Sequence, residues 1–194
     1  MNRMPKTALR ILAAIVALAP ASARAAACEG VTLSDTVQID GHPLVLNGMG
    51  VREATVFNVN VYVAGLYLEA RSTDANAILD AESRKFLTLQ FVRNVSRTDI
   101  VNTYSESFPR NAGPRMAALQ DRFRQFLAML SDVRSGQAMR YTYVPGNGLQ
   151  VALDNQIRGT IPGADFARVF FSIWLGPNPP NAGLKSGLLG GRCG

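Results

Sequence analysis

The chain has 194 residues, 47% of them hydrophobic, which is enough for one domain with a sizeable core. Its net charge of +6 is unevenly distributed, because residues 1–25 hold four of the 20 Lys and Arg residues and none of the 14 Asp and Glu residues. The rest of the chain has 16 basic against 14 acidic residues, a net charge of only +2, and no dense basic patch. We therefore expect no nucleic acid among its partners.

The N-terminus has the three parts of a secretory signal peptide. Basic residues precede an unbroken apolar run from 11 to 19, Pro20 ends that run, and Ala23-Arg24-Ala25 fits the small-residue pattern of a cleavage site. The apolar run is too short to cross a bilayer as a helix. We expect residues 1–25 to be removed and one domain of residues 28–194, with no transmembrane segment, to be secreted into a bacterial periplasm.

The first half of the mature chain predicts β structure. Asp40-Gly41 is a strong hairpin signal between two apolar segments. Successive side chains of a strand point to opposite faces, and a turn near Asn58 would place Arg52 opposite Tyr62 on paired strands. The strands expected in this half cover residues 31–39, 42–50, 51–55, 59–68 and 86–93.

The middle of the chain predicts two helices. Ser96 and Asp99 form an N-cap pair for the first helix, which should end near Phe108, before Pro109. The second helix should begin at Pro114, because proline is favoured at the first helical position. Its apolar residues recur at helical spacing and should face the core; they are Met116, Leu119, Phe123, Phe126, Leu127 and Leu130.

The last third predicts a return to strands and then to helices. Gly176 and Pro177 are typical of a helix end, and the Phe and Trp residues before them are interpreted as core. Strands, then helices, then strands, then helices indicate an α+β domain, an antiparallel sheet covered on one face by helices. The elements expected here are strands 139–144, 149–153 and 156–161, with turns at 145–148 and 154–155, followed by helices 164–175 and 184–189.

Two cysteines lie one near each end of the mature chain. In an oxidising compartment we expect Cys28 and Cys193 to form a disulfide. Closing so long a loop would restrict the unfolded chain and contribute roughly 2–4 kcal/mol. The alternatives are two thiols in the tails, or a lipid attached to Cys28.

The inventory of reactive side chains argues against most enzyme classes. His42 is the only histidine and follows a turn, so it supports neither a histidine metal site nor a Ser-His-Asp triad. No dinucleotide-binding glycine pattern and no isolated pair of acids stands out. We expect no metal and no cofactor, and we interpret His42 as a surface loop residue.

Arg52 and Tyr62 are the candidate ligand-binding residues. A guanidinium always carries its charge and matches a carboxylate with two parallel hydrogen bonds, and a tyrosine hydroxyl can donate a third. At the base of an apolar cleft, such a pair would hold an acid whose hydrocarbon tail enters the core. The alternative is that Arg52 pairs internally with Glu53, Glu69 or another internal acid, and that Tyr62 only packs.

Three segments of the chain resemble the chalcone isomerase fold family. They read LNGMGVRE, VYVAGLYLE and FFSIWLGPNPPNAGLKSGLLG, and in their order and spacing they span about residues 30–190. The resemblance implies an open-faced β-sandwich, a large antiparallel sheet covered by a layer of helices. The family contains enzymes that close chalcones to flavanones, plant fatty-acid-binding members and non-catalytic relatives.

The resemblance also implies roles for particular residues. Arg52 matches the arginine used by both the enzymes and the fatty-acid binders. Tyr62 falls where the enzymes have a catalytic threonine and the fatty-acid binders have a tyrosine that contacts the carboxylate. The other catalytic positions of the enzymes, a tyrosine, an asparagine and a late Thr or Ser, fall here on Ile100, Ser107 and Ile173. Ring closure needs groups that orient the substrate and stabilise an enolate, and isoleucine supplies none.

Three functional hypotheses follow. The first is a non-catalytic protein that binds a fatty acid or another amphipathic carboxylate between sheet and helices, with Arg52 and Tyr62 on the head group. The second is an isomerase or intramolecular lyase acting on another phenolic or enone compound, with Arg52 as electrophile. The third is a structural or interaction module of the cell envelope, in which Arg52 is paired internally.

Overall fold

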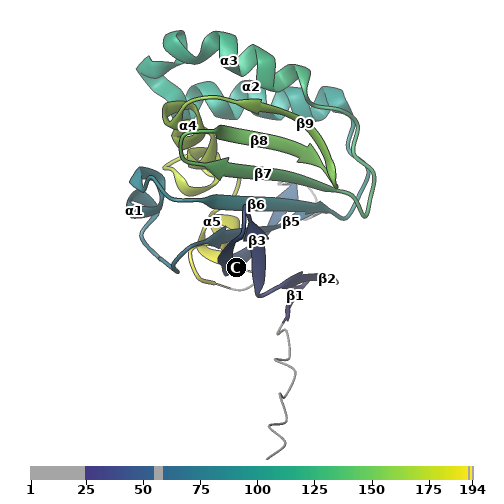
Figure 1. The fold of residues 1–194 in the computed structure, drawn as a ribbon. Coiled ribbons are helices and arrows are strands. Elements are labelled where there is room, and N and C mark those ends of the chain that lie inside the picture. Colours follow the sequence, from purple (N-terminus) through teal and green to yellow (C-terminus); the bar gives the residue numbers. More distant parts are fainter. Residues whose placement is uncertain (1–24, 55–58, 192, 194) are drawn as a thin grey trace, which may run out of the picture.

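The fold is built on one curled antiparallel sheet of seven strands. The computed structural model describes residues 25–54, 59–191 and Cys193. The strands follow one another in the sheet in the order in which they occur in the chain, so every connection joins neighbours (Figure 1). They are β3 (Thr36–Ile39), β4 (His42–Ala54), β5 (Val59–Leu68), β6 (Lys85–Phe91), β7 (Ala138–Val144), β8 (Gly148–Leu153) and β9 (Gln156–Ile161).

Helices cover one face of this sheet, and a small two-stranded sheet covers part of the other. The helical side holds the larger core, to which β5–β9 and all five helices contribute. The helices are α1 (Ala75–Asp80), α2 (Arg97–Ala112), α3 (Met116–Ala128), α4 (Ala164–Leu175) and α5 (Ala182–Leu188), with a 3-10 turn η1 (Gly113–Arg115) before α3. On the other side, β1 (Ala25–Cys28) and β2 (Val31–Ser34) pack on β4, β5 and β6. The predicted α+β architecture is confirmed.

The hairpin turns follow from left-handed backbone positions. Asp40 and Gly41 have φ of 49° and 75°, and Ile39 pairs directly with His42 across this two-residue turn. This pairing confirms the predicted hairpin. Aspartate and glycine suit the turn because they tolerate positive φ at little cost. Asp154, with φ of 52°, begins the predicted turn between β8 and β9.

Two strand predictions need correction. Residues 31–39 form two strands in different sheets, because the chain leaves the small sheet at Asp35, whose carbonyl accepts from Leu46 N at 2.8 Å. Conversely, residues 42–54 form one strand, β4, rather than two, with register shifts between Leu46 and Gly48 and at Arg52–Glu53. Both shifts change strand pairing without ending the strand. The turn predicted near Asn58 lies in residues 55–58, outside the described part of the chain.

The prediction that the first long helix ends before Pro109 is wrong. Helix α2 continues through Pro109 to Ala112, and Gly113 caps it with φ of 54°. Phe108 and Ala112 are both buried in the core, so their packing favours continuation of the helix. Proline has no N–H for the carbonyl of Ser105, but Ser105 is exposed and its carbonyl can be hydrated.

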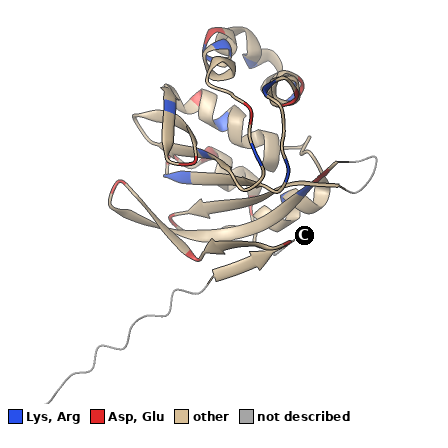
Figure 2. Ribbon diagram, turned by 90° about the vertical axis from the view of Figure 1, so that its right-hand side faces the viewer, with Lys and Arg blue, Asp and Glu red and all other residues tan. Residues whose placement is uncertain are grey.

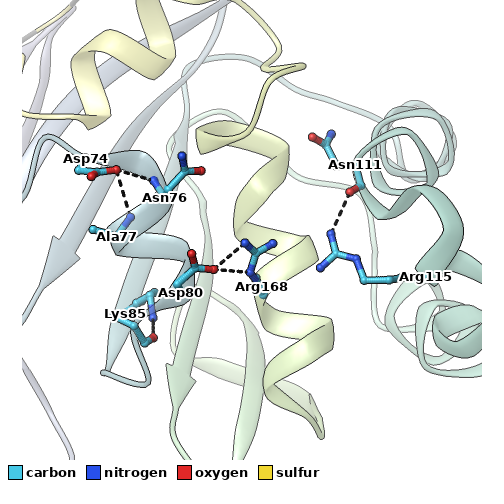
Figure 3. A network of polar contacts seen from close by, with 9 residues as sticks. Asp74, Asn76, Ala77, Asp80, Lys85, Asn111, Arg115 and Arg168 are labelled. Atoms are coloured by element: carbon cyan, nitrogen blue, oxygen red, sulfur yellow. Dashed lines mark hydrogen bonds and ion pairs between the residues drawn. The ribbon is translucent and has the colours of Figure 1, made fainter.

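The other helices agree closely with the prediction, with one omission. Helix α4 has the predicted bounds, and α5 begins two residues earlier than expected. The predicted start at Pro114 falls in the 3-10 turn η1, after which α3 buries Leu119, Phe123 and Phe126 as expected. The short helix α1 was not predicted; Asp74 caps it by accepting from two backbone N–H groups (Figure 3).

The termini of the described domain lie together. The structure places Cys28 and Cys193 at disulfide distance, with their Cα atoms 5.5 Å apart. The tail also borders β4, where Met49 N donates to Gly191 O and Cys193 N donates to Met49 O. Of the predicted signal peptide, residues 1–24 lie outside the described residues, and Ala25 is the first residue of β1.

Charges of both signs are interspersed along the helices and strands (Figure 2). Four ion pairs join described residues, and one of them, between Asp80 and Arg168, connects α1 to α4 (Figure 3). Within the described residues, no helix is both long and apolar enough to cross a membrane.

Candidate functional site

A cleft of about 460 Å³ lies between the sheet and α2. Its volume is within the range of small-molecule sites, roughly 300–1,000 Å³. It is bounded by the ends of β4, β5 and β6, by α2, by the last turns of α4 and by residues 178–180. We call it the Arg52 cleft. Its apolar lining residues are Val61, Leu89, Phe91, Val95, Ile100, Met139 and Ile173.

Strand register brings Arg52 and Tyr62 together. They are direct partners on β4 and β5, so their side chains lie on the same face of the sheet, as predicted. That face is the helical one, because Ala64, two residues after Tyr62, belongs to the core under the helices. Val51 and Val63, their neighbours in sequence, pack on the opposite face.

Arg52 contacts backbone oxygens rather than a carboxylate. Its Nη1 donates to Pro180 O at 3.3 Å and to Glu53 O. Glu69, one of the internal partners considered for Arg52, pairs instead with Arg84 at 3.2 Å. Within the described residues, no ion pair includes Arg52. Carbonyl oxygens satisfy N–H groups but leave the guanidinium charge without a counter-charge.

Tyr62 is half-buried and lines the cleft, and its hydroxyl contacts the buried Trp174. The oxygen accepts from Trp174 Nε1 at 3.0 Å, and the ring packs on Phe91 with centroids 5.5 Å apart. Burial raises the pKa of Tyr62 to about 12, although the Trp174 bond and the Arg52 charge both act to lower it. The hydroxyl therefore keeps its proton at neutral pH and can act as a donor.

The rim of the cleft carries mixed charges. Besides Arg52, the lining includes Arg93 and Arg110 and two acids, Asp99 and Glu106. All four rim side chains are on exposed residues, so water screens them more than it screens the deeper groups. The formal sum is one positive charge, which a single carboxylate would balance.

The three positions that match the enzymes' other catalytic residues also line this cleft. Ile100 and Ile173 are 5% and 2% exposed and present only hydrocarbon. The Ser107 hydroxyl donates back to Thr103 O at 2.7 Å on its own helix. The structure thus brings together all five residues that the resemblance singled out, and two of them are apolar.

Sequence reasoning missed two tyrosines and gave Trp174 only a core role. Tyr104 lines the cleft one turn after Ile100 on α2, and its hydroxyl lies 2.5 Å from that of Tyr141 in the core. Burial raises the pKa of Tyr104 well above its ordinary value. The four-residue spacing from Ile100 was the available signal, since residues at i and i+4 share a helix face.

The remaining candidate residues lie away from the cleft. His42 is exposed, as predicted, but it is the first residue of β4 and pairs with Ile39 rather than lying in a loop. In the described ranges, no group of three or more His, Cys, Asp or Glu side chains could hold a metal ion.

Comparison with known proteins gives a family and a fold. A family model described as chalcone isomerase-like matches residues 25–190. The crystal structure of an Arabidopsis thaliana fatty-acid binding protein superposes with a TM-score of 0.71, at 15% sequence identity, covering 86% of this chain and 96% of that one. No sequence among the curated proteins matches this chain.

Proposed function

Because the chain belongs to the chalcone isomerase-like family, we propose that it binds a fatty acid or a similar amphipathic carboxylate in the Arg52 cleft. One observation carries the proposal: a guanidinium without a carboxylate partner, among the described residues, stands beside a protonated tyrosine hydroxyl in a cleft that has both apolar and charged lining residues. A partly buried charge of this kind is costly unless something neutralises it. The carboxylate of a ligand would do so.

The head group would be held by two kinds of donor. Arg52 supplies charge and a fork of N–H groups, and Tyr62 supplies one O–H group. Hydrogen bonds to a charged partner contribute roughly 1.5–3 kcal/mol each, about twice a neutral bond. The formal charge of the lining, one positive, also suits a monoanion better than a dianion such as a phosphate monoester.

The tail would lie along the apolar wall under α2. The resemblance places Ile100 and Ile173 where the enzymes have hydrogen-bonding residues, and both side chains present hydrocarbon to the cleft, which a hydrocarbon chain can cover. Each buried methylene contributes about 0.8 kcal/mol. The similarity of fold to a fatty-acid binding protein points in the same direction.

The proposal is tested by binding measurements with palmitate. Wild-type protein, purified and stripped of lipid, should bind palmitate, and protein from gentle preparations should carry acids detectable by native mass spectrometry. Arg52→Ala should lower the affinity for palmitate about 10- to 100-fold, because one or two charge-assisted hydrogen bonds to the carboxylate are lost.

Arg158→Ala is a matched control for the loss of one positive charge. Arg158 is exposed on β9, at the far edge of the sheet from β3, and among the described residues its side chain has no ion pair. Its substitution should leave palmitate affinity within about twofold. Absence of acyl ligand in native preparations, together with no affinity of the wild type for any fatty acid, would contradict the proposal.

The isomerase alternative keeps one supporting observation. Tyr104 puts a second phenol into the lining, one helical turn from the position matched to the catalytic tyrosine. Its hydroxyl is already bonded to Tyr141, which argues against a direct role. Loss of chalcone absorbance on mixing with the protein, abolished in Arg52→Ala, would favour this alternative.

We also propose that the protein acts after export to the periplasm, on the basis of its N-terminal sequence. N-terminal sequencing of protein expressed with residues 1–25 should find a mature chain that begins close to Ala26. A chain that still begins at Met1 would contradict export by cleavage.

A further inference from the structure

The hydroxyl of Tyr62 has one hydrogen-bond partner among the described residues, and this partner determines whether the hydroxyl accepts or donates in that bond. An indole N–H only donates, so the Tyr62 oxygen must be the acceptor in its 3.0 Å bond from Trp174 Nε1. The proton of Tyr62 therefore remains to be donated. No acceptor for it is found among the residues that the structure describes.

Trp174 is held rigidly. It is 2% exposed, and aromatic rings surround it at centroid distances of 5.2 Å for Phe170 and 6.2 Å for both Tyr104 and Tyr141. Packing of this kind leaves the indole few alternative rotamers, so the direction of its N–H is set by the core. Helix α4, which carries it, has the largest share of buried residues of any helix in the described chain.

We infer that Trp174 is a positioning residue for ligand binding: its indole N–H occupies the Tyr62 oxygen from the core side and turns the Tyr62 proton toward the ligand head group in the Arg52 cleft. A phenol O–H rotates about its C–O bond, and an acceptor contact on one side leaves the proton on another. A donor bonded to the oxygen also polarises the O–H and strengthens the bond that it donates. This inference rests on the proposed function and adds to it the residue that aims the second donor.

A double-mutant cycle with palmitate tests the inference. Tyr62→Phe removes the donor to the head group and should lower palmitate affinity about 10-fold. Trp174→Phe keeps an aromatic ring but removes the N–H, and should lower the affinity about 3- to 10-fold. If Trp174 acts through Tyr62, the double variant should match Tyr62→Phe within about twofold, because Trp174 has nothing left to orient.

A spectroscopic readout separates positioning from packing. The chain has one Trp, so its indole N–H gives a single resonance in a proton–nitrogen correlation spectrum. Tyr62→Phe should move this resonance upfield and speed its exchange with solvent, and palmitate should move it in the wild type. Tyr67→Phe is the matched control: the Tyr67 hydroxyl bonds Ser34 O at 2.8 Å on the other face of the sheet. It should leave both the resonance and palmitate affinity unchanged.

The outcomes distinguish this inference from the proposed function. Palmitate binding with additive losses in the cycle would overturn the positioning role while leaving fatty-acid binding in place. No palmitate binding by the wild type would overturn both. Should Trp174→Phe fail to fold, the indole resonance decides: a signal that does not move in Tyr62→Phe overturns the inference.

Discussion

The charge of Arg52 is faced, in the described fold, by the oxygen dipoles of Pro180 and Glu53. Those oxygens belong to different parts of the chain, one in the loop after α4 and one in β4 itself. The guanidinium is therefore fixed in place before any ligand arrives, which lowers the entropy cost of binding. A long side chain that is mobile in solvent would lose more conformational entropy when it binds an acid.

Lys85 is a second cation, among the described residues, with an unusual environment. It is 3% exposed, its ammonium donates to Ala81 O and Ser83 O, and it lies 5.1 Å from the centre of the Tyr143 ring. Burial lowers its pKa to about 8, although Glu82 and Glu69 act to raise it. The unfolded chain, in which Lys85 has its ordinary pKa of 10.5, therefore holds more protons than the folded protein between these two pH values.

This difference predicts a pH dependence of stability. Because the unfolded state binds the extra proton, the free energy of unfolding should gain from Lys85 as pH rises from about 8 toward 10.5. Urea unfolding of wild type and Lys85→Met between pH 7.5 and 9.5 should show the wild type gaining about 1 kcal/mol relative to the variant. A constant difference between the two proteins would contradict the assigned pKa.

The tyrosines set the highest pH at which this comparison of unfolding free energies reports on Lys85. Burial raises the pKa of Tyr62 and Tyr67 to about 12, from an ordinary value of 10. Above pH 10 the unfolded chain loses tyrosine protons that the folded protein keeps, so stability should fall there. Comparison with Lys85→Met below pH 10 isolates the lysine from this opposing effect.

At the scale of elements, α5 and β4 meet without intervening side chains. A Cβ on Gly187 would lie 2.1 Å from Met49 O and 2.7 Å from Gly50 Cα, so the helix backbone rests directly on the strand backbone. Only glycine on both sides permits this approach. The contact holds the start of the C-terminal tail against the strand that carries Arg52.

Gly187→Ala should therefore destabilise the fold. The added methyl group cannot be accommodated unless α5 moves off β4, and we expect a loss of about 2–3 kcal/mol in the free energy of unfolding. Ser186→Ala, at the neighbouring exposed position of the same helix, should change stability by less than about 0.5 kcal/mol. Equal stabilities of the two variants in chemical denaturation would show that the close approach is not required.

Local signals predicted those elements whose boundaries are set by local chemistry. The hairpin at Asp40-Gly41 depends on left-handed backbone conformations that few residues adopt, and α4 ends at Gly176, directly before Pro177; both were predicted correctly. The break at Asp35 and the continuation of α2 through Pro109 depend on tertiary packing. No pattern within a short window carries that information.

The candidate site shows the same division: its strand pairing could be predicted from local patterns, and its tertiary contacts could not. Alternation along β5 and a turn predicted near Asn58 placed Arg52 opposite Tyr62, and the register confirms this pairing. The bond from Trp174 joins residues 112 positions apart and depends on how α4 crosses the sheet. An apolar helix face predicted that Trp174 is buried, but a burial pattern does not identify the partner of a single N–H group.

At the scale of the whole molecule, the two ends of the described domain meet at the cysteine pair, whose members lie at disulfide distance. The residues are 165 positions apart in sequence, so a bond between them closes nearly the entire domain into one loop. In the chain-entropy account, a loop of this length restricts the unfolded chain strongly.

Removing the pair should destabilise the domain. Cys28→Ser with Cys193→Ser is expected to lower the free energy of unfolding by roughly 2–5 kcal/mol, measured by guanidinium denaturation under oxidising conditions. A reducing agent should lower the stability of the wild type by a similar amount and leave the double variant unchanged. If reduction does not shift the wild-type midpoint, the bond contributes nothing to stability.

The contact of the C-terminal tail with β4 has a consequence for how the protein is made. Met49 is bonded by Gly191 and Cys193, which the ribosome adds only after every strand of the seven-stranded sheet. A nascent chain that does not yet include Gly191 lacks the segment that borders β4, so this part of the strand edge is uncovered at that stage. The edge beside Met49 can close only when the segment after α5 has been made, and a chain that stops before Gly191 should leave it open.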